Sequence, residues 1–308
     1  MHVVITGATG LIGRPLARAL VTAGHDVTAL TRNVARAERL LPARCIGKEW
    51  SPTGPVAPDL LRGVDAVVHL AGEGVADRRW TTERKQTIRD SRVYGTRALV
   101  DAMASLPNTE RPRVVVSASA IGYYGDRGDE QLDERSPPGR DFLAEVCAAW
   151  EHEAFKAAAL GVRVVAVRIG IVLSSDGGAL AKMLLPFRLG AGGRVGSGRQ
   201  WMSWIHLADL VALFTFALDN PVVSGPVNGV APEPVVNRTF TAELGRALQR
   251  PALVPLPVFA LRLAFGEMSS VLLASQRVSP AAAERLGFRF QHPRLPGALA
   301  EIVSHLLT

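Results

Sequence analysis

Short apolar runs alternate with amphipathic stretches along the first part of the chain. Residues 2–5 predict a buried strand, and the amphipathic pattern after it predicts a helix through Leu20 that Gly24 ends. Further strands are predicted at residues 26–30, 44–50, 65–70, 114–117 and 162–169, with helices at about 82–105 and 141–160. Strands that alternate with helices predict an α/β fold with a doubly wound parallel sheet.

The pattern changes near residue 174, where glycine-rich pieces alternate with short helical stretches. We therefore expect residues 1–173 to form the sheet-containing domain and residues 174–308 to form a smaller substrate lobe with a C-terminal extension. Residues 203–230 are expected to complete the edge of the sheet.

The loop after the first strand has glycine at positions 7, 10 and 13. Gly7 allows a tight turn, Gly10 lets a pyrophosphate approach the backbone, and Gly13 lets the helix pack on its strand. The amino end of that helix then faces the anion. A glycine pattern between a strand and a helix predicts a dinucleotide site. Its predicted contacts are Gly7, Thr9, Gly10, Leu11, Ile12 and Gly13.

The end of the second strand indicates which dinucleotide binds. An NAD site usually has an acidic residue here to hold the ribose 2′-hydroxyl. This chain instead has Thr31 and Arg32, with Arg36 one helical turn further on. A guanidinium matches a 2′-phosphate through paired hydrogen bonds, so we predict NADP(H). The alternative is that Arg32 is a solvated surface residue and that NAD binds.

The charge balance does not indicate a nucleic-acid partner. The net charge is +7, but the 35 basic residues are spread along the chain and aromatic residues make up only 6%. An excess of arginine suits a phosphorylated small molecule. Hydrophobic residues make up 48% of the chain, as in a packed globular protein.

Other features narrow the class further. There is no apolar stretch near the ~18 residues of a membrane span. The glycine turn begins at Gly7, which leaves no room for a signal peptide. Cys45 and Cys147 lie far apart, and the seven histidines show no metal-ligand spacing. We therefore expect a cytoplasmic protein with no membrane partner, no disulfide and no metal.

Several segments carry a resemblance to a known family. They are TGATGLIG at 6–13, HLAGE at 69–73, DSRVYGTR at 90–97, WIHLADLV at 204–211 and GFRFQHPRLPGAL at 287–299. The chain resembles the short-chain dehydrogenase/reductase superfamily of the extended Rossmann type, which includes nucleotide-sugar epimerases and dehydratases. It is most similar to the atypical "epimerase family" branch with a distinct C-terminal extension.

One departure from the superfamily concerns proton transfer. Its members use Tyr-x-x-x-Lys, in which the phenol acts as general acid and base. The extended type adds a glutamate four residues later, and counting back four and eight residues from Glu151 gives Cys147 and Leu143. None of the three tyrosines is followed four residues later by lysine. The asparagine of the family's NVxGT motif is replaced by Arg92, which the resemblance implies could pair with cofactor phosphate or ribose.

The fifth predicted strand leads to the candidate catalytic groups. Ser119, or Ser117, stands where the superfamily has the serine that binds a substrate carbonyl; alternatively, its hydroxyl only satisfies the strand end. Tyr123 and Tyr124 follow directly. Without a lysine partner, we expect a phenol pKa near 10. A substrate-binding role is favoured for Tyr124.

Glu73 is an alternative base. In a closed pocket its pKa would be raised, although a hydrogen bond to a ribose hydroxyl is an equal possibility. Trp150, on an apolar helix face, is assigned to the core. The further residues predicted to bind the cofactor are Leu70, Ala71, Gly72, Glu73, Arg92, Ser117 and Arg168.

Two features of the 174–308 lobe bear on substrate and assembly. In extended relatives this region holds a nucleotide diphosphate, and a glycine-rich surface loop with scattered arginines is the alternative. The apolar stripe of Leu256, Phe259 and Leu263 predicts core or the face of a homodimer. The candidate residues for this nucleotide-diphosphate site are Arg188, Arg194, Arg199, Trp201 and His206.

Two functions follow from these observations. The first is an NADP(H)-dependent oxidoreductase or epimerase-like enzyme acting on a small carbonyl or hydroxyl compound, with nucleotide sugars among the candidates. The second is a non-catalytic NADP(H)-binding regulator or scaffold, linked to cell division by a label that some relatives carry. The missing Tyr–Lys pair favours the second, and the superfamily favours catalysis.

Overall fold

The computed structural model describes residues 1–304 and 306, and seven strands within them form one parallel sheet. The strand order is β11-β7-β5-β4-β1-β2-β3, which changes direction between β1 and β4. In such sheets a ligand crevice lies beyond the carboxyl ends of the strands at this point. The strands are β1 (His2–Thr6), β2 (Asp26–Thr31), β3 (Cys45–Glu49), β4 (Ala66–His69), β5 (Val114–Ala120), β7 (Arg163–Ile169) and β11 (Gly225–Gly229).

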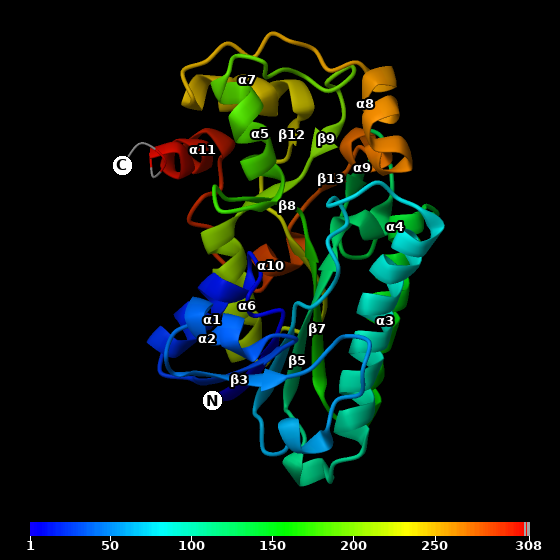
Figure 1. Ribbon diagram of the computed structural model, residues 1–308, viewed down its shortest axis with the longest axis vertical. Coiled ribbons are helices and arrows are strands. Elements are labelled where there is room, and N and C mark those ends of the chain that lie inside the picture. Colours follow the sequence, from blue (N-terminus) through cyan, green and yellow to red (C-terminus); the bar gives the residue numbers. More distant parts are fainter. Residues whose placement is uncertain (305, 307–308) are drawn as a thin grey trace.

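Helices cover both faces of the sheet (Figure 1). Because both faces are buried, the strands are continuous apolar runs: Val3 and Ile5 belong to the core under α1 and α6, and Val4 belongs to the core under α3. The prediction of a doubly wound α/β fold is confirmed. The helices are α1 (Gly13–Thr22), α2 (Val34–Leu40) and α6 (Leu207–Asp219) on one side, with α3 (Thr82–Ala104) and α4 (Phe142–Phe155) on the other.

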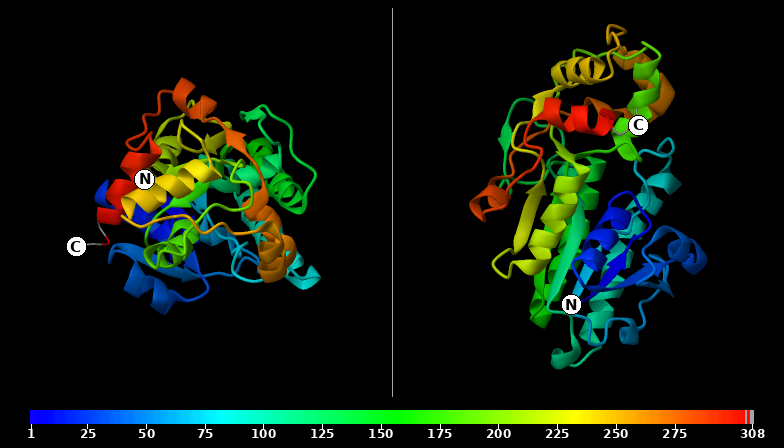
Figure 2. Two further views of the ribbon diagram at one scale, coloured as in Figure 1. Left: turned by 90° about the horizontal axis from the view of Figure 1, so that it is seen from above. Right: turned by 90° about the vertical axis from the view of Figure 1, so that its left-hand side faces the viewer.

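A smaller lobe lies at one end of the molecule (Figure 2). Its core includes Trp204, Phe240 and Leu295. Its helices are α5 (Gly178–Arg188), α7 (Asn237–Ala247), α8 (Val258–Phe265), α9 (Ser269–Leu273) and α11 (Leu295–Ser304), and α10 (Ala281–Arg285) lies nearer the sheet. Three short pairs complete it: β8 (Ile171–Leu173) with β10 (Trp204–His206), β9 (Trp201–Met202) with β12 (Val235–Val236), and β6 (Gln131–Leu132) with β13 (Arg277–Val278). No helix in the described part of the chain is long and apolar enough to cross a membrane.

Two predicted elements differ in detail. The strand predicted at 114–117 continues to Ala120, so Ser119 lies within β5. The helix predicted over 141–160 changes to a 3-10 helix, Lys156–Leu160, before Gly161 ends it at φ 80°.

The apolar stripe is not core. Phe259 is 74% exposed and Leu263 77% exposed, and Leu256 is also exposed. Helix α8 lies at the surface of the lobe and turns only Leu261 fully inward. The assignment to core is therefore wrong, while the homodimer face stays a prediction.

Candidate functional site

Two glycines at the turn between β1 and α1, Gly7 and Gly13, leave no room for a side chain. Gly7 has φ +70°, and a Cβ there would lie 2.8 Å from the carbonyl carbon of Leu70. A Cβ on Gly13 would lie 2.3 Å from the carbonyl oxygen of Gly7. Helix α1 has no side-chain cap and no acidic residue in its first turn. Its positive end is therefore available to an anion at the carboxyl edge of the sheet.

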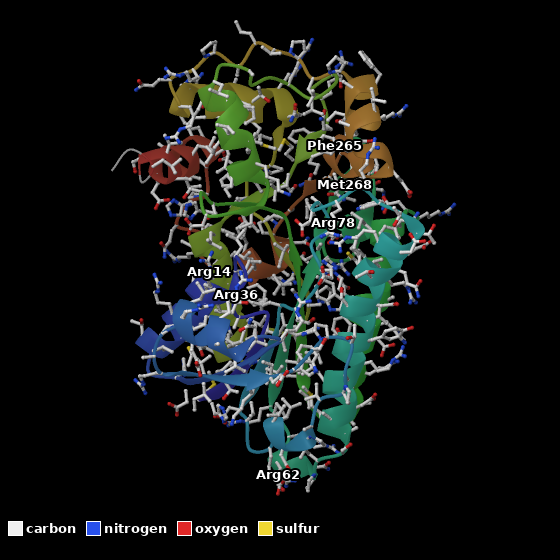
Figure 3. All side chains as sticks on the ribbon, viewed as in Figure 1. Arg14, Arg36, Arg62, Arg78, Phe265 and Met268 are labelled. Atoms are coloured by element: carbon white, nitrogen blue, oxygen red, sulfur yellow. The ribbon has the colours of Figure 1, made fainter. Side chains whose placement is uncertain are left out.

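Arginines surround this edge. The Arg32 side chain at the end of β2 is 70% exposed. Arg14 on α1 and Arg36 on α2 come from the same part of the molecule (Figure 3). The Nε of Arg14 is buried and has no hydrogen-bond partner among the described residues. This combination provides guanidinium groups for a phosphate.

The carboxylate of Glu73 lies between Arg32 and a further arginine, Arg84 at the start of α3. Its Oε1 is 3.3 Å from Arg32 Nη1, and its Oε2 is 3.3 Å from Arg84 Nη1. Its backbone is also held, because Ser91 Oγ accepts from the Glu73 amide and Arg92 Nη1 donates to the Glu73 carbonyl at 2.9 Å. The carboxylate predicted as a base or ribose ligand is thus part of an arginine cluster.

A buried histidine supports the segment that faces the glycine turn. His69 Nδ1 lies 2.7 Å from Thr6 Oγ1, which also accepts from the amides of Leu70 and Ala71. Burial, with a smaller effect from the charge of Arg92, lowers the pKa of His69 to about 3. The ring is therefore neutral, and Thr6 fixes the backbone of the predicted ribose-binding segment. Arg92 itself lies against Gly72, where a Cβ would approach its Cζ to 3.1 Å.

The predicted catalytic serine lies in a buried network. Ser119 Oγ donates to Glu151 Oε1 at 2.6 Å, and Arg168 donates to both oxygens of the same carboxylate at 2.9 and 2.8 Å. Arg168 and Ser119 are at most 3% exposed. Although burial lowers the pKa of Arg168, its bonds to Glu151 raise it above the ordinary value. The Arg168 predicted to bind cofactor therefore has its hydrogen-bond donors occupied inside the protein.

Tyr124 extends this network. Its hydroxyl donates to Asn228 Oδ1 at 2.7 Å and accepts from Arg168 Nη1 at 3.0 Å. Burial raises the pKa of Tyr124 to about 12, so the expectation of a value near 10 is wrong for this residue. Tyr123 is half-buried, and its ring centre lies 3.5 Å from the Arg168 guanidinium. Tyr123 is thus the more accessible of the two phenols.

Leu143 and Cys147 stand where the family has the tyrosine and lysine that transfer the proton. A Cβ on Gly122, in the 3-10 helix Ile121–Tyr124 that follows β5, would lie 3.3 Å from Leu143 and 3.8 Å from Cys147 Sγ. Burial raises the pKa of the Cys147 thiol to about 12. Neither side chain can exchange a proton near neutral pH.

The remaining predicted residues are distributed differently. Ser117 is buried and donates to the Ala118 carbonyl. Trp150 is buried in the core, as predicted. Arg188, Arg194 and Arg199 are exposed on α5 and the loop after it.

The smaller lobe is tied to the loop over the crevice. Arg79 donates to the Leu263 carbonyl, and Lys85 Nζ lies 2.9 Å from Glu267 Oε1. Trp80, in the same loop, packs edge to face against Phe142 of α4. The contacts of Arg79 and Lys85 join this part of the chain to α8 and the 3-10 helix after it, whereas Trp80 joins it to α4.

Sequence reasoning missed several members of the site. They include Arg84, Glu134 and Asn228. These residues lie in no recognised sequence motif, and only the tertiary structure brings them to the site. Glu134 Oε1 accepts from the Asn228 amide at 3.0 Å. The one available signal was Glu151, which stands where the extended type has the glutamate that follows its Tyr-x-x-x-Lys.

Comparison with known proteins agrees with this geometry. Residues 3–229 match the NAD dependent epimerase/dehydratase family, and residues 256–302 match a domain of unknown function, DUF1731. The chain is 44% identical over 310 residues to "Epimerase family protein SDR39U1 homolog, chloroplastic" of Arabidopsis thaliana, covering 98% of this chain and 87% of the relative. It is 35% identical over 305 residues to "Epimerase family protein YfhF" of Bacillus subtilis, covering 99% and 98%.

A solved structure of the human epimerase family protein SDR39U1 (isoform2) with NADPH superposes with a TM-score of 0.86 at 35% identity, over 99% of both chains. The strand order and the glycine turn define a Rossmann fold of the extended short-chain dehydrogenase/reductase type. The chain belongs to the NAD dependent epimerase/dehydratase family, in its branch with a DUF1731 C-terminal domain.

Proposed function

We propose that the chain is an NADP(H)-dependent oxidoreductase or epimerase-like enzyme acting on a small carbonyl or hydroxyl compound. The observation that carries the proposal is the combination of the glycine turn with Arg32. The turn admits no Cβ at Gly13, and the end of β2 offers a guanidinium where an NAD site has a carboxylate. The human relative was solved with NADPH, which supports the same cofactor.

The residues present fit this cofactor. The glycine turn and the amino end of α1 would hold the pyrophosphate, and Arg32 with Arg36 would hold the 2′-phosphate. The backbone of residues 70–73 would face the ribose. When bound, the nicotinamide supplies the hydride step.

The chain's own side chains would then bind and orient the substrate. Tyr123, stacked on Arg168, is the half-buried phenol that we propose contacts it. Ser119 and Tyr124 would hold the end of β5 in place through Glu151, Arg168 and Asn228. Because Leu143 and Cys147 replace the relay, the proton must come from another group, with Tyr123 and Glu73 as candidates.

The test is oxidation of NADPH against a library of carbonyl compounds, with nucleotide sugars also analysed for a change of isomer because an epimerase consumes no cofactor overall. Tyr123→Phe is expected to lower kcat by about 10²-fold or more while NADPH affinity is unchanged. Tyr94→Phe, a tyrosine exposed on α3, is the matched control and should behave as wild type. Turnover that survives Tyr123→Phe would exclude the role of Tyr123, and no turnover of any class would contradict the enzyme.

The second candidate is a non-catalytic NADP(H)-binding regulator, which the inert pair Leu143 and Cys147 favours. A partner would then be captured to different extents with NADPH and with NADP⁺. Gly10→Asp places a negative charge in the turn and should abolish that difference. Capture that is the same in all these states would exclude the regulator.

A further inference from the structure

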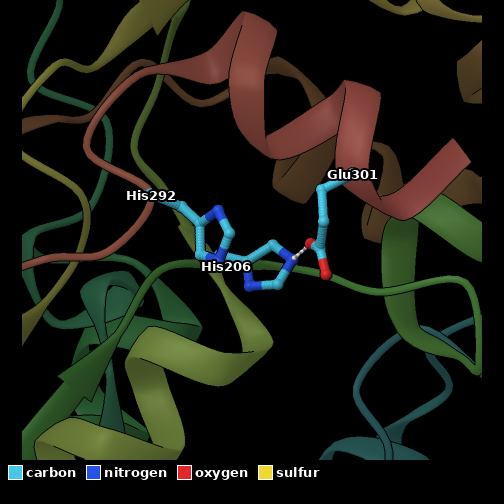
Figure 4. A group of neighbouring side chains, drawn as sticks. All are labelled: His206, His292 and Glu301. Carbon is cyan, nitrogen blue, oxygen red and sulfur yellow. Dashed lines mark ion pairs between the residues drawn. The ribbon is translucent and has the colours of Figure 1, made fainter. Parts of the chain in front are cut away.

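Three side chains from distant segments meet beside the amino end of α6. They are His206 at the start of that helix, His292 in the segment between α10 and α11, and Glu301 on α11 (Figure 4). One ligand atom of each lies within 4.8 Å of the other two. None of these residues belongs to the site described above.

A buried carboxylate holds His292 beside His206. Asp209 is fully buried, and its carboxylate accepts from the amides of Gln291 at 2.8 Å and His292 at 2.9 Å. Asp209 lies three residues after His206 on α6, so it fixes His292 beside the His206 ring. The two ring centres are 3.9 Å apart. A metal site benefits from this kind of preorganisation by outer hydrogen bonds.

The third group comes from a well-packed helix. Helix α11 buries Leu295, Ala298, Leu299 and Ile302, so the carboxylate of Glu301 projects from a fixed backbone. Its Oε2 lies 2.7 Å from His206 Nε2. The three groups therefore converge through packing and not through a flexible loop tip.

The proton arrangement shows where a cation would bind. His206 Nδ1 accepts from the Ala208 amide at 3.2 Å, so the ring proton lies on Nε2 and points at Glu301. A cation between Nε2 and the carboxylate would take the place of that proton. The proton would move to Nδ1, and the Ala208 amide would lose this one capping bond.

An open surface pocket of about 370 Å³ borders two of the three groups. It is lined by His206 and Glu301, together with Pro15, Ser174, Ser175 and Val211. It provides room for water or a small anion as a further ligand. Three protein ligands with one open position are the pattern of zinc sites that bind exchangeable ligands.

We propose that His206, His292 and Glu301 bind one divalent transition-metal ion of the zinc type. Two imidazoles and a carboxylate are the ligands such ions take, whereas calcium and magnesium prefer oxygen ligands alone. Asp209 is a positioning residue for His292. The site would connect α6, which packs on the sheet, to the C-terminal helix.

The experiment is a titration of the metal-free full chain with Co²⁺, followed by its visible absorption, and with Zn²⁺ by calorimetry. Wild type is expected to bind one ion and to show the bands of a nitrogen- and oxygen-ligated Co²⁺. His292→Ala and Glu301→Gln should each bind at least about ten-fold more weakly and lose these bands. His152→Ala, an exposed histidine on α4, is the matched control and should behave as wild type.

Thermal unfolding in EDTA shows whether each variant is folded. If His292→Ala does not fold, metal binding by Glu301→Gln decides the test. Equal binding by wild type and a folded variant, or no specific binding by wild type, overturns the proposal. NADPH affinity should be unchanged in both variants, so the cofactor proposal succeeds or fails independently.

Discussion

Arg168 and Glu151 form a buried ion pair that joins β7 to α4 through two hydrogen bonds, of 2.9 and 2.8 Å. Both side chains are at most 6% exposed. Ser119 and Tyr124, the serine and tyrosine that the sequence places at the candidate site, are both bonded to this pair. The end of β5 is therefore held by charge as well as by packing.

Glu151→Gln should destabilise the fold by about 3–5 kcal/mol, because it leaves the Arg168 charge buried without its partner. Urea unfolding followed by circular dichroism measures this. Glu130→Gln is the control: its ion pair with Arg127 lies at the surface, so about 1 kcal/mol or less is expected. Equal losses in the two variants would show that the buried pair is not important for stability.

Arg32→Ala should weaken NADPH binding by about ten-fold or more, because it removes charge-assisted hydrogen bonds to the 2′-phosphate. NADH has no such phosphate, so its affinity should change little. Fluorescence titration of both nucleotides gives the ratio. Arg62→Ala removes an arginine at the far end of the molecule (Figure 3) and should leave both affinities as they are. A parallel loss for NADPH and NADH would argue against a 2′-phosphate contact.

His69 should make the free energy of unfolding depend on pH. Its pKa is about 3 in the folded protein and about 6.5 when unfolded, so the unfolded chain binds the proton better. Stability is fully present above about pH 6.5 and is lost as the pH falls toward 3. Between about pH 7.5 and pH 5, His69 should account for roughly 2 kcal/mol of the loss.

His69→Gln removes this titration. Unfolding free energies at the two pH values should therefore differ by roughly 2 kcal/mol less in His69→Gln than in wild type. The same pH dependence in both proteins would mean that His69 is not the group responsible.

Cys147 occupies the position of the relay lysine but should be chemically silent. Burial keeps its thiol protonated, with a pKa of about 12. A thiol reagent at neutral pH should leave it unmodified in the folded protein and modify it in denaturant. Cys147→Ala should bind NADPH as wild type does. Fast modification of native Cys147, identified by peptide mass, would contradict this assignment.

The cofactor half of the site could be predicted because it is local in sequence. The glycines at 7, 10 and 13 lie within one turn, and Arg32 follows directly after its strand. The strands themselves were predictable, since a strand buried on both faces is a continuous apolar run, as in β1 and β4.

The rest of the site depends on contacts between distant positions. Ser119 and Glu151 are 32 residues apart, and Tyr124 and Asn228 are 104 apart. No local pattern shows that Tyr124 is buried, so the expectation of a pKa near 10, which rests on the missing lysine partner, leaves out the effect of burial. The same holds for His206, His292 and Glu301, which have no metal-ligand spacing in sequence. The stripe of Leu256, Phe259 and Leu263 has the periodicity of a buried helix face, which is why core is one of its two predicted roles beside a homodimer face.

The central claim is that an arginine-lined glycine turn holds a phosphorylated nicotinamide dinucleotide. Calorimetric titration of the wild-type chain with NADPH, and separately with NADH, tests it most directly. The account predicts saturable binding of one NADPH per chain, with NADH weaker by about ten-fold or more. Binding of neither nucleotide, or tighter binding of NADH, would contradict it.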